Sequence, residues 1–182
     1  MRKTTKLRRQ SGFTLLETMI AMAVLSFGVL SVASFFTQGL KNSYQAQITF
    51  IAQQKAQEAM ETIFTARDTK LLTWAQIANV SQGGVFNDNA QPLCAPGPDG
   101  LFGTNDDDCN NPDGVDIAPG PDNIFGTADD VQMPLNPWMT RTIAITPVPS
   151  FPNLNKITVT VAWVYEGQAG QFQIVSYISS YS

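Results

Sequence analysis

Aspartate is concentrated in one part of this chain, and that concentration points to metal chemistry. Residues 88–130 contain ten aspartates, and no Lys or Arg lies between Leu71 and Thr140. Carboxylates crowded in this way repel one another, and either solvent or a divalent cation must offset the repulsion. The 182-residue sequence contains no histidine, which excludes Ser-His-Asp catalysis and His-containing zinc sites.

The acidic segment contains an internal duplication. Residues 95–107 read APGPDGLFGTNDD and residues 118–130 read APGPDNIFGTADD, so ten of 13 positions are identical at an offset of 23. We call these segments the first repeat and the second repeat. Their high content of Gly, Pro and Asp predicts loops rather than core strands.

Two interpretations of the repeats are open. In one, they are solvated turns; in the other, each is a calcium loop, since Ca²⁺ is bound by six to eight oxygens from carboxylates and carbonyls. Gly103 and Gly126 permit a tight bend in each repeat. Phe102 and Phe125 are expected to anchor the repeats to the core. The candidate ligands have the same spacing in both repeats: Asp99, Asp106 and Asp107, and then Asp122, Asp129 and Asp130.

The two cysteines, Cys94 and Cys109, flank the first repeat. If this segment lies outside the cytoplasm, a disulfide is expected, because such compartments are oxidising. Closing a loop of this length, about 15 residues, stabilises a fold by about 3 kcal/mol in the chain-entropy model. A redox-active pair is the alternative, although the spacing is not C-x-x-C.

Residues 13–36 form a nearly continuous apolar run whose single charge is Glu17. As a helix this run would extend about 36 Å, which is enough to cross a bilayer core of about 30 Å. Five basic residues lie within the first ten positions and predict a cytoplasmic N-terminus. A carboxylate inside an apolar span is costly, so Glu17 is expected to have a cationic partner.

Residues 9–21 read RQSGFTLLETMIA. This segment resembles the prepilin signal of type IV pilins and type II secretion pseudopilins. The resemblance implies that a prepilin peptidase cuts after Gly12 and methylates the new amino terminus at Phe13. It also implies that Glu17 pairs with the terminal amine of a neighbouring subunit during assembly. The C-terminal pattern resembles minor pilins of the PilV type or GspI-like pseudopilins.

The resemblance implies a structural filament subunit rather than an enzyme. Such a subunit is held in the inner membrane and then extracted into a pilus or pseudopilus, at the cell surface or in the periplasm. Its partners would be other pilin subunits, the prepilin peptidase and the inner membrane, and nucleic acid is not expected. The alternative is a single-pass, membrane-anchored periplasmic module that binds calcium or acts in adhesion, which would not need Glu17.

Beyond the apolar run, hydrophobic residues from Tyr44 to Ile63 recur at helical spacing. They predict one helix from residue 13 to about residue 66, bent or broken at Gly39. Residues 69–80 predict a short helix or turn. Three segments rich in β-branched and aromatic residues predict an antiparallel meander, interrupted at its first connection by prolines. These strands are expected at residues 139–146, 156–165 and 171–181.

The expected fold is therefore α+β, with a long N-terminal helix packed on a C-terminal antiparallel β-sheet. The resemblance implies that the leader, residues 1–12, is cleaved. The transmembrane and assembly half of the helix covers residues 13–40, and a globular domain outside the cytoplasm covers residues 41–182. Within that domain an acidic loop occupies residues 94–131, ahead of strands at about 139–181.

Overall fold

The computed structural model describes residues 12–135, 137–165 and 167–181. It divides the chain into two units, Met1–Ala46 and Gln47–Ser182. Helix α1 (Leu15–Asp68) contributes to both units. The described remainder of the second unit consists of short 3-10 helices and β-strands. The expected cleaved leader, except for Gly12, lies outside the described residues.

The first unit contains the N-terminal part of α1. Thr14 caps the helix, because its Oγ1 accepts a hydrogen bond from the Glu17 amide at 3.3 Å and its carbonyl accepts one from the Thr18 amide at 3.2 Å. Hydroxyl groups inside the apolar run bond back to helix carbonyls, as Ser26 and Ser31 do at 2.8 Å. The predicted break at Gly39 is wrong, since α1 continues through it; the cost of one glycine in a helix is small.

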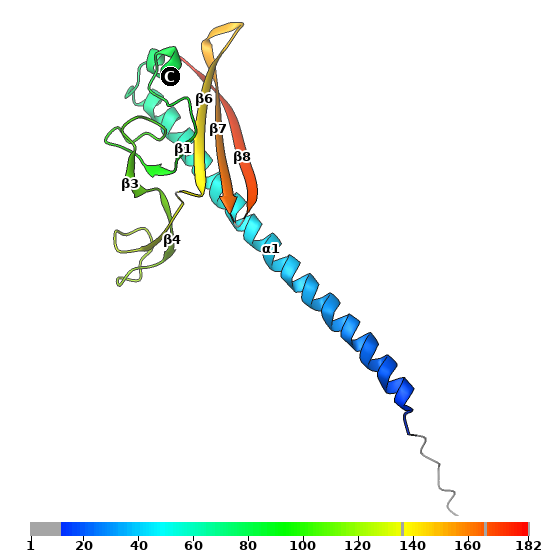
Figure 1. The fold of residues 1–182 in the computed structure, drawn as a ribbon. Helices are drawn as coiled ribbons and strands as arrows, with labels where there is room; N and C mark the ends of the chain where they lie inside the picture. The colour runs from blue at the N-terminus through cyan, green and yellow to red at the C-terminus, as the bar shows by residue number, and fades with distance from the viewer. Residues whose placement is uncertain (1–11, 136, 166, 182) are drawn as a thin grey trace, which may run out of the picture. The chain divides into compact units, whose positions relative to one another are not determined.

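The second unit is built on a four-stranded antiparallel sheet in the order β1-β6-β7-β8. Its strands are β1 (Gln91–Pro92), β6 (Met139–Val148), β7 (Phe151–Tyr165) and β8 (Gln168–Ser179). The predicted meander is confirmed, and Figure 1 shows β6, β7 and β8 side by side. Of the three prolines predicted to interrupt the first connection, only Pro149 lies between β6 and β7. Pro147 and Pro152 lie within β6 and β7, near a register shift close to the turn.

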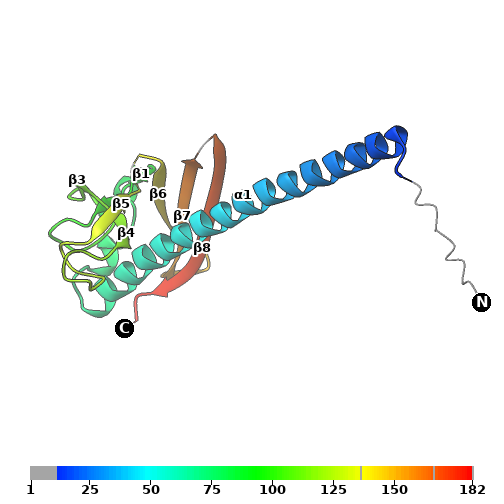
Figure 2. The same ribbon diagram turned by 90° about the horizontal axis from the view of Figure 1, so that it is seen from below.

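One face of the sheet is buried against the C-terminal part of α1. The side chains of β6 and β7 alternate, so that Ile143 and Ile145 on β6 and Ile157 and Val159 on β7 point into the core. Small residues of α1 such as Ala52 allow the helix backbone to approach the sheet. Figure 2 shows this part of α1 running along the strands, which confirms the α+β architecture.

Two β-hairpins and two 3-10 helices fill the chain between α1 and the sheet. The 3-10 helices are η1 (Trp74–Gln76) and η2 (Val80–Gln82). The first hairpin pairs β2 (Cys94–Ala95) with β3 (Asp108–Pro112), and the second pairs β4 (Gly114–Ala118) with β5 (Val131–Pro134). Both hairpins lie on the same side of the four-stranded sheet in Figure 1, where they are coloured green to yellow-green.

Candidate functional site

Each acidic repeat is the loop of one of these hairpins. The first repeat is closed by the pair Ala95 and Asp108, and the second by the pair Ala118 and Val131. Both closing pairs follow the 23-residue offset of the sequence duplication. Each pair also adjoins a register shift in its hairpin. The duplication therefore extends from sequence to strand pairing.

Several internal hydrogen bonds of the first repeat recur at the equivalent positions of the second. In the first repeat, Asp99 accepts from the Leu101 amide at 2.8 Å and Asp107 accepts from the Gly103 amide at 2.8 Å. In the second repeat the same two bonds measure 2.9 Å, between Ile124 and Asp122, and 2.6 Å, between Gly126 and Asp130. The threonine hydroxyls also form equivalent hydrogen bonds: Thr104 donates to Asp106 and Thr127 donates to Asp129, each at 2.7 Å.

The backbone of the repeats explains one of their three sequence differences. Gly100 has φ of 69°, in the left-handed region. Its counterpart Asn123 has φ of 57°. Asparagine tolerates this region better than most residues with a side chain, so the same turn survives the exchange. Gly103 and Gly126 also have positive φ, which confirms the bend expected at both positions.

The second repeat gathers three carboxylates that could hold a cation. One oxygen from each of Asp122, Asp129 and Asp130 lies within 4.8 Å of the other two. Of the residues that the structure describes, this is the one group of three or more acidic or thiol ligands at such spacing. The corresponding residues of the first repeat, Asp99, Asp106 and Asp107, are linked to its loop by hydrogen bonds but do not form such a group.

The two repeats differ in electrostatic environment. Burial raises the pKa of the Asp107 carboxyl, although hydrogen bonds from Gly103 and Thr104 act in the opposite direction. For Asp130, desolvation acts to raise the pKa, but the amides of Gly126 and Gly120 outweigh it, so that its pKa lies below the ordinary value. The lowered pKa keeps the Asp130 carboxylate in the charged form, which is the form that binds cations.

The predicted aromatic anchors behave differently in the two repeats. Phe102 is 4% exposed and packs in the core together with Leu101, as predicted. Phe125 is 61% exposed, and its neighbour Ile124 is 60% exposed. The expectation that Phe125 anchors the second repeat is therefore wrong. Its hairpin carries the loop away from the core that receives Phe102.

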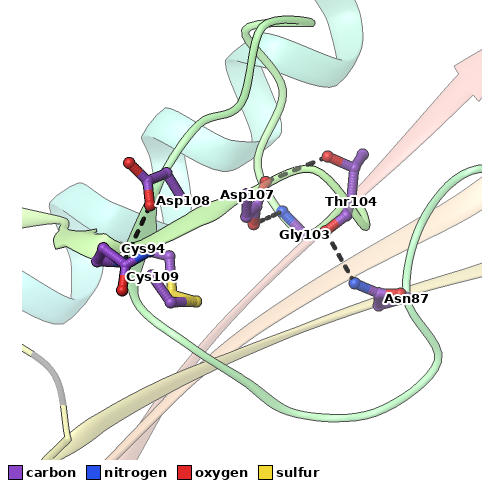
Figure 3. The surroundings of a disulfide bond; sticks show 8 residues. Asn87, Cys94, Gly103, Thr104, Asp107, Asp108 and Cys109 are labelled. Atoms are coloured by element: carbon purple, nitrogen blue, oxygen red, sulfur yellow. Dashed lines mark hydrogen bonds between the residues drawn. A yellow bond between two sulfur atoms is a disulfide. The ribbon is translucent and has the colours of Figure 1, made fainter.

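Cys94 and Cys109 form the disulfide expected from the sequence, and it links β2 to β3 at the base of the first repeat (Figure 3). The same view shows Asp107 accepting hydrogen bonds from Gly103 and Thr104. Asn87 donates to the Thr104 carbonyl at 3.0 Å and so ties the loop to the preceding segment. The disulfide therefore holds the base of the first repeat, Phe102 anchors its tip in the core, and Asn87 binds its side at Thr104.

A buried ion cluster joins α1, the connection between the hairpins and β6. Lys55 Nζ lies 2.5 Å from Asp113 Oδ1 and 3.1 Å from Glu58 Oε2. Arg141 Nη1 lies 3.7 Å from Asp113 Oδ2, and the Arg141 guanidinium stands over the Phe102 ring at 4.2 Å. This cluster was not predicted from the sequence. Its one local signal is Arg141, which shares the buried face of β6 with Met139 and Ile143.

In the first unit, the signal residues lie at the start of α1. Gly12 and Phe13 precede the helix, and Phe13 is 81% exposed. Glu17 is in the first turn, where a negative charge is favourable at the positive end of the helix dipole. No hydrogen bond or ion pair of its carboxylate is found in the part of the chain that the structure describes.

The apolar run of α1 is exposed along its whole length. Every large hydrophobic side chain from Phe13 to Leu40 is at least half exposed. By length and composition, α1 could cross a membrane. Because a signal sequence near an N-terminus can have the same length and composition, the sequence motif at the start of α1 is needed to interpret this helix.

Comparison with known families identifies the motif at the start of α1. Residues 7–33 match the family described as the prokaryotic N-terminal methylation motif. The chain carries a prepilin-type N-terminal signal. This match includes Gly12, Phe13 and Glu17, and, together with the apolar helix, it indicates anchoring in a membrane. No curated protein and no solved structure matches the chain significantly.

Proposed function

We propose that this protein is a structural subunit of a type IV pilus or a type II secretion pseudopilus. The observation that supports the proposal most strongly is the prepilin-type signal immediately before an exposed apolar helix. Cleavage after Gly12 would leave Phe13 as the first residue, with a free amine that the peptidase methylates. Other pilin subunits would then cover the apolar face of α1 when the subunit leaves the inner membrane.

The placement of Glu17 gives this proposal a mechanism. Glu17 follows Phe13 by four positions in the sequence, and its carboxylate has no partner within the described chain. In lipid, both charges are costly to bury, and an amine of a neighbouring subunit would relieve the cost of both. Such a pair specifies the axial register of adjoining helices more than it contributes to stability.

Substitution of Glu17 tests this mechanism. Glu17→Ala should abolish recovery of the protein in sheared surface filaments or pseudopili, while the amount in the inner membrane stays unchanged. Glu61→Ala is the matched control, since Glu61 is an exposed glutamate on the same helix, outside the apolar run. Normal incorporation of the Glu17→Ala protein would contradict the proposed pairing.

We propose in addition that the second repeat binds calcium. The support is the group formed by Asp122, Asp129 and Asp130, whose hard oxygen donors are of the kind that Ca²⁺ prefers. These three carboxylates would hold the ion, with carbonyl and water oxygens completing its coordination. Bound calcium would neutralise part of the repulsion within an aspartate-rich segment that lacks any basic residue.

Unfolding of the full-length protein with and without calcium tests the second proposal. Calcium at about 100 times its dissociation constant should raise the free energy of unfolding by about 2.7 kcal/mol, provided that the site unfolds with the rest of the domain. Asp129→Asn should reduce this effect, whereas the equivalent Asp106→Asn in the first repeat should retain it. Equal melting temperatures in calcium and in chelator would favour the solvated-turn interpretation.

A further inference from the structure

The two repeats form the same loop but present their hydrophobic tips to different surroundings. In the first repeat, Leu101 is 2% exposed and Phe102 is 4% exposed. In the second, Ile124 is 60% exposed and Phe125 is 61% exposed. We call Ile124 and Phe125 the second tip. The hydrogen bonds that shape each loop are made by aspartate and threonine, so the fold of the loop does not explain the hydrophobic character of the second tip.

The glycine next to each tip shows the same difference. A Cβ added to Gly103 would lie 2.7 Å from Cδ1 of Ile143, because the first repeat rests on β6. A Cβ added to Gly126 would meet nothing within 4 Å. The two glycines have similar backbone angles, with φ of 79° and 86°. Within the described residues, the second repeat therefore keeps the shape of the first repeat but lacks the packing surface on which the first repeat rests.

The surroundings of the first repeat define what such a loop recognises. Phe102 lies under the guanidinium of Arg141, at 4.2 Å from its ring centre, and Ile143 covers the adjoining glycine. The charge of Arg141 also favours the charged form of Asp107, although the ion pair of Arg141 is with Asp113. An arginine set among aliphatic side chains thus stacks on the aromatic ring of this loop and attracts its acid. The second repeat retains both groups as Phe125 and Asp130.

We propose that the second tip is a docking site for another protein, whose surface presents an arginine beside aliphatic side chains. Charge favours a different protein over a second copy of this chain. Apart from the basic residues of the first ten positions, the chain has only six Lys and Arg. Two of these, Lys55 and Arg141, are buried in the ion cluster described above. This inference is independent of the cleavage and assembly of α1.

A photoreactive residue tests which surface covers the second tip. The full-length protein, with p-benzoyl-phenylalanine in place of Phe125, is irradiated in its native cells, and adducts are mapped by mass spectrometry. We expect an adduct with a different protein, in a peptide that contains an arginine. Replacing that arginine by alanine should reduce the adduct yield about tenfold. The matched control places the photoreactive residue at Val131, which is 52% exposed on β5, and its yield should not depend on that arginine.

Several results would overturn the proposal. One is an adduct yield at position 125 that does not exceed the yield at Val131. Another is an adduct only with lipid or only with a second copy of this chain. A third is a yield that does not change when the arginine is replaced. Melting provides an independent check on the full-length protein. Phe102→Ala should lower the Tm by about 10 °C, whereas Phe125→Ala should change it by less than about 2 °C. An equal loss in the two variants would mean that Phe125 packs within its own chain.

Discussion

Lys55 and Asp113 form a buried ion pair between α1 and the connection of the two hairpins, with 2.5 Å between Nζ and Oδ1. Each side chain is only 9% exposed. Arg141 of β6 adds a second cation at 3.7 Å from the same carboxylate. A single aspartate thus links three elements that are far apart in the sequence, and its loss would leave two buried cations with less compensation.

The first prediction concerns this aspartate. Asp113→Asn should reduce the free energy of unfolding by about 3 kcal/mol, because it leaves Lys55 and Arg141 without their shared anion. Urea unfolding of the full-length protein in detergent measures the change. Asp116→Asn is the control, since the amide oxygen can still accept the hydrogen bond from Gln132, and it should cost less than about 0.5 kcal/mol. Equal effects of the two variants would contradict a special role for Asp113.

The same pair predicts a loss of stability at alkaline pH. Burial acts to lower the pKa of Lys55, but Asp113 and Glu58 outweigh it and hold the pKa above its ordinary value of 10.5. A raised pKa means that the folded state binds the proton more tightly than the unfolded state does. The stabilisation by Lys55 is therefore complete below pH 10.5 and is lost as the pH rises through the raised pKa.

A comparison of variants isolates this pH effect. Lys55→Met should be less stable than the wild type at pH 8, and the difference should shrink above about pH 10.5. Lys70→Met removes an exposed lysine that lies just beyond the end of α1, and it corrects for the general effects of alkaline solution. A constant difference in stability between the wild type and Lys55→Met across this pH range would show that the Lys55 pair does not titrate as expected.

Features that depend on neighbouring residues in the sequence could be predicted, whereas features that depend on tertiary contacts could not. The helix from Leu15 and the strands β6 to β8 follow from local periodicity, and the signal around Gly12 and Glu17 is a local motif. The ion cluster of Lys55, Asp113 and Arg141 depends on tertiary placement, and no local pattern of the sequence brings these residues together. Even so, the inward position of Arg141 in its strand was a signal that a buried acid should be present.

The repeats show the same limit in a sharper form. Their sequences are nearly identical, and the identity correctly predicted two loops of one design. It wrongly predicted that Phe102 and Phe125 are both buried, because burial depends on where each hairpin lies against the core. Local sequence specifies the hydrogen bonds inside each loop, whereas only tertiary structure specifies which surface its tip meets.

The disulfide gives a further prediction. Replacing both Cys94 and Cys109 by serine should lower the free energy of unfolding by about 3 kcal/mol, since the closed loop spans 15 residues. Thermal unfolding of the full-length protein should show this loss, and reduction of the wild type should reproduce it. If neither treatment lowers the melting temperature, then the first repeat is held by Phe102 and by the contacts of Asn87 alone.

The proposed function requires that this chain is processed as a prepilin before it assembles. Intact-mass analysis of the protein extracted from native membranes and filaments measures this processing. We expect a mature chain that begins at Phe13 and carries one additional methyl group on its amino terminus. A chain that retains Met1 and residues 2–12 in both fractions would contradict it.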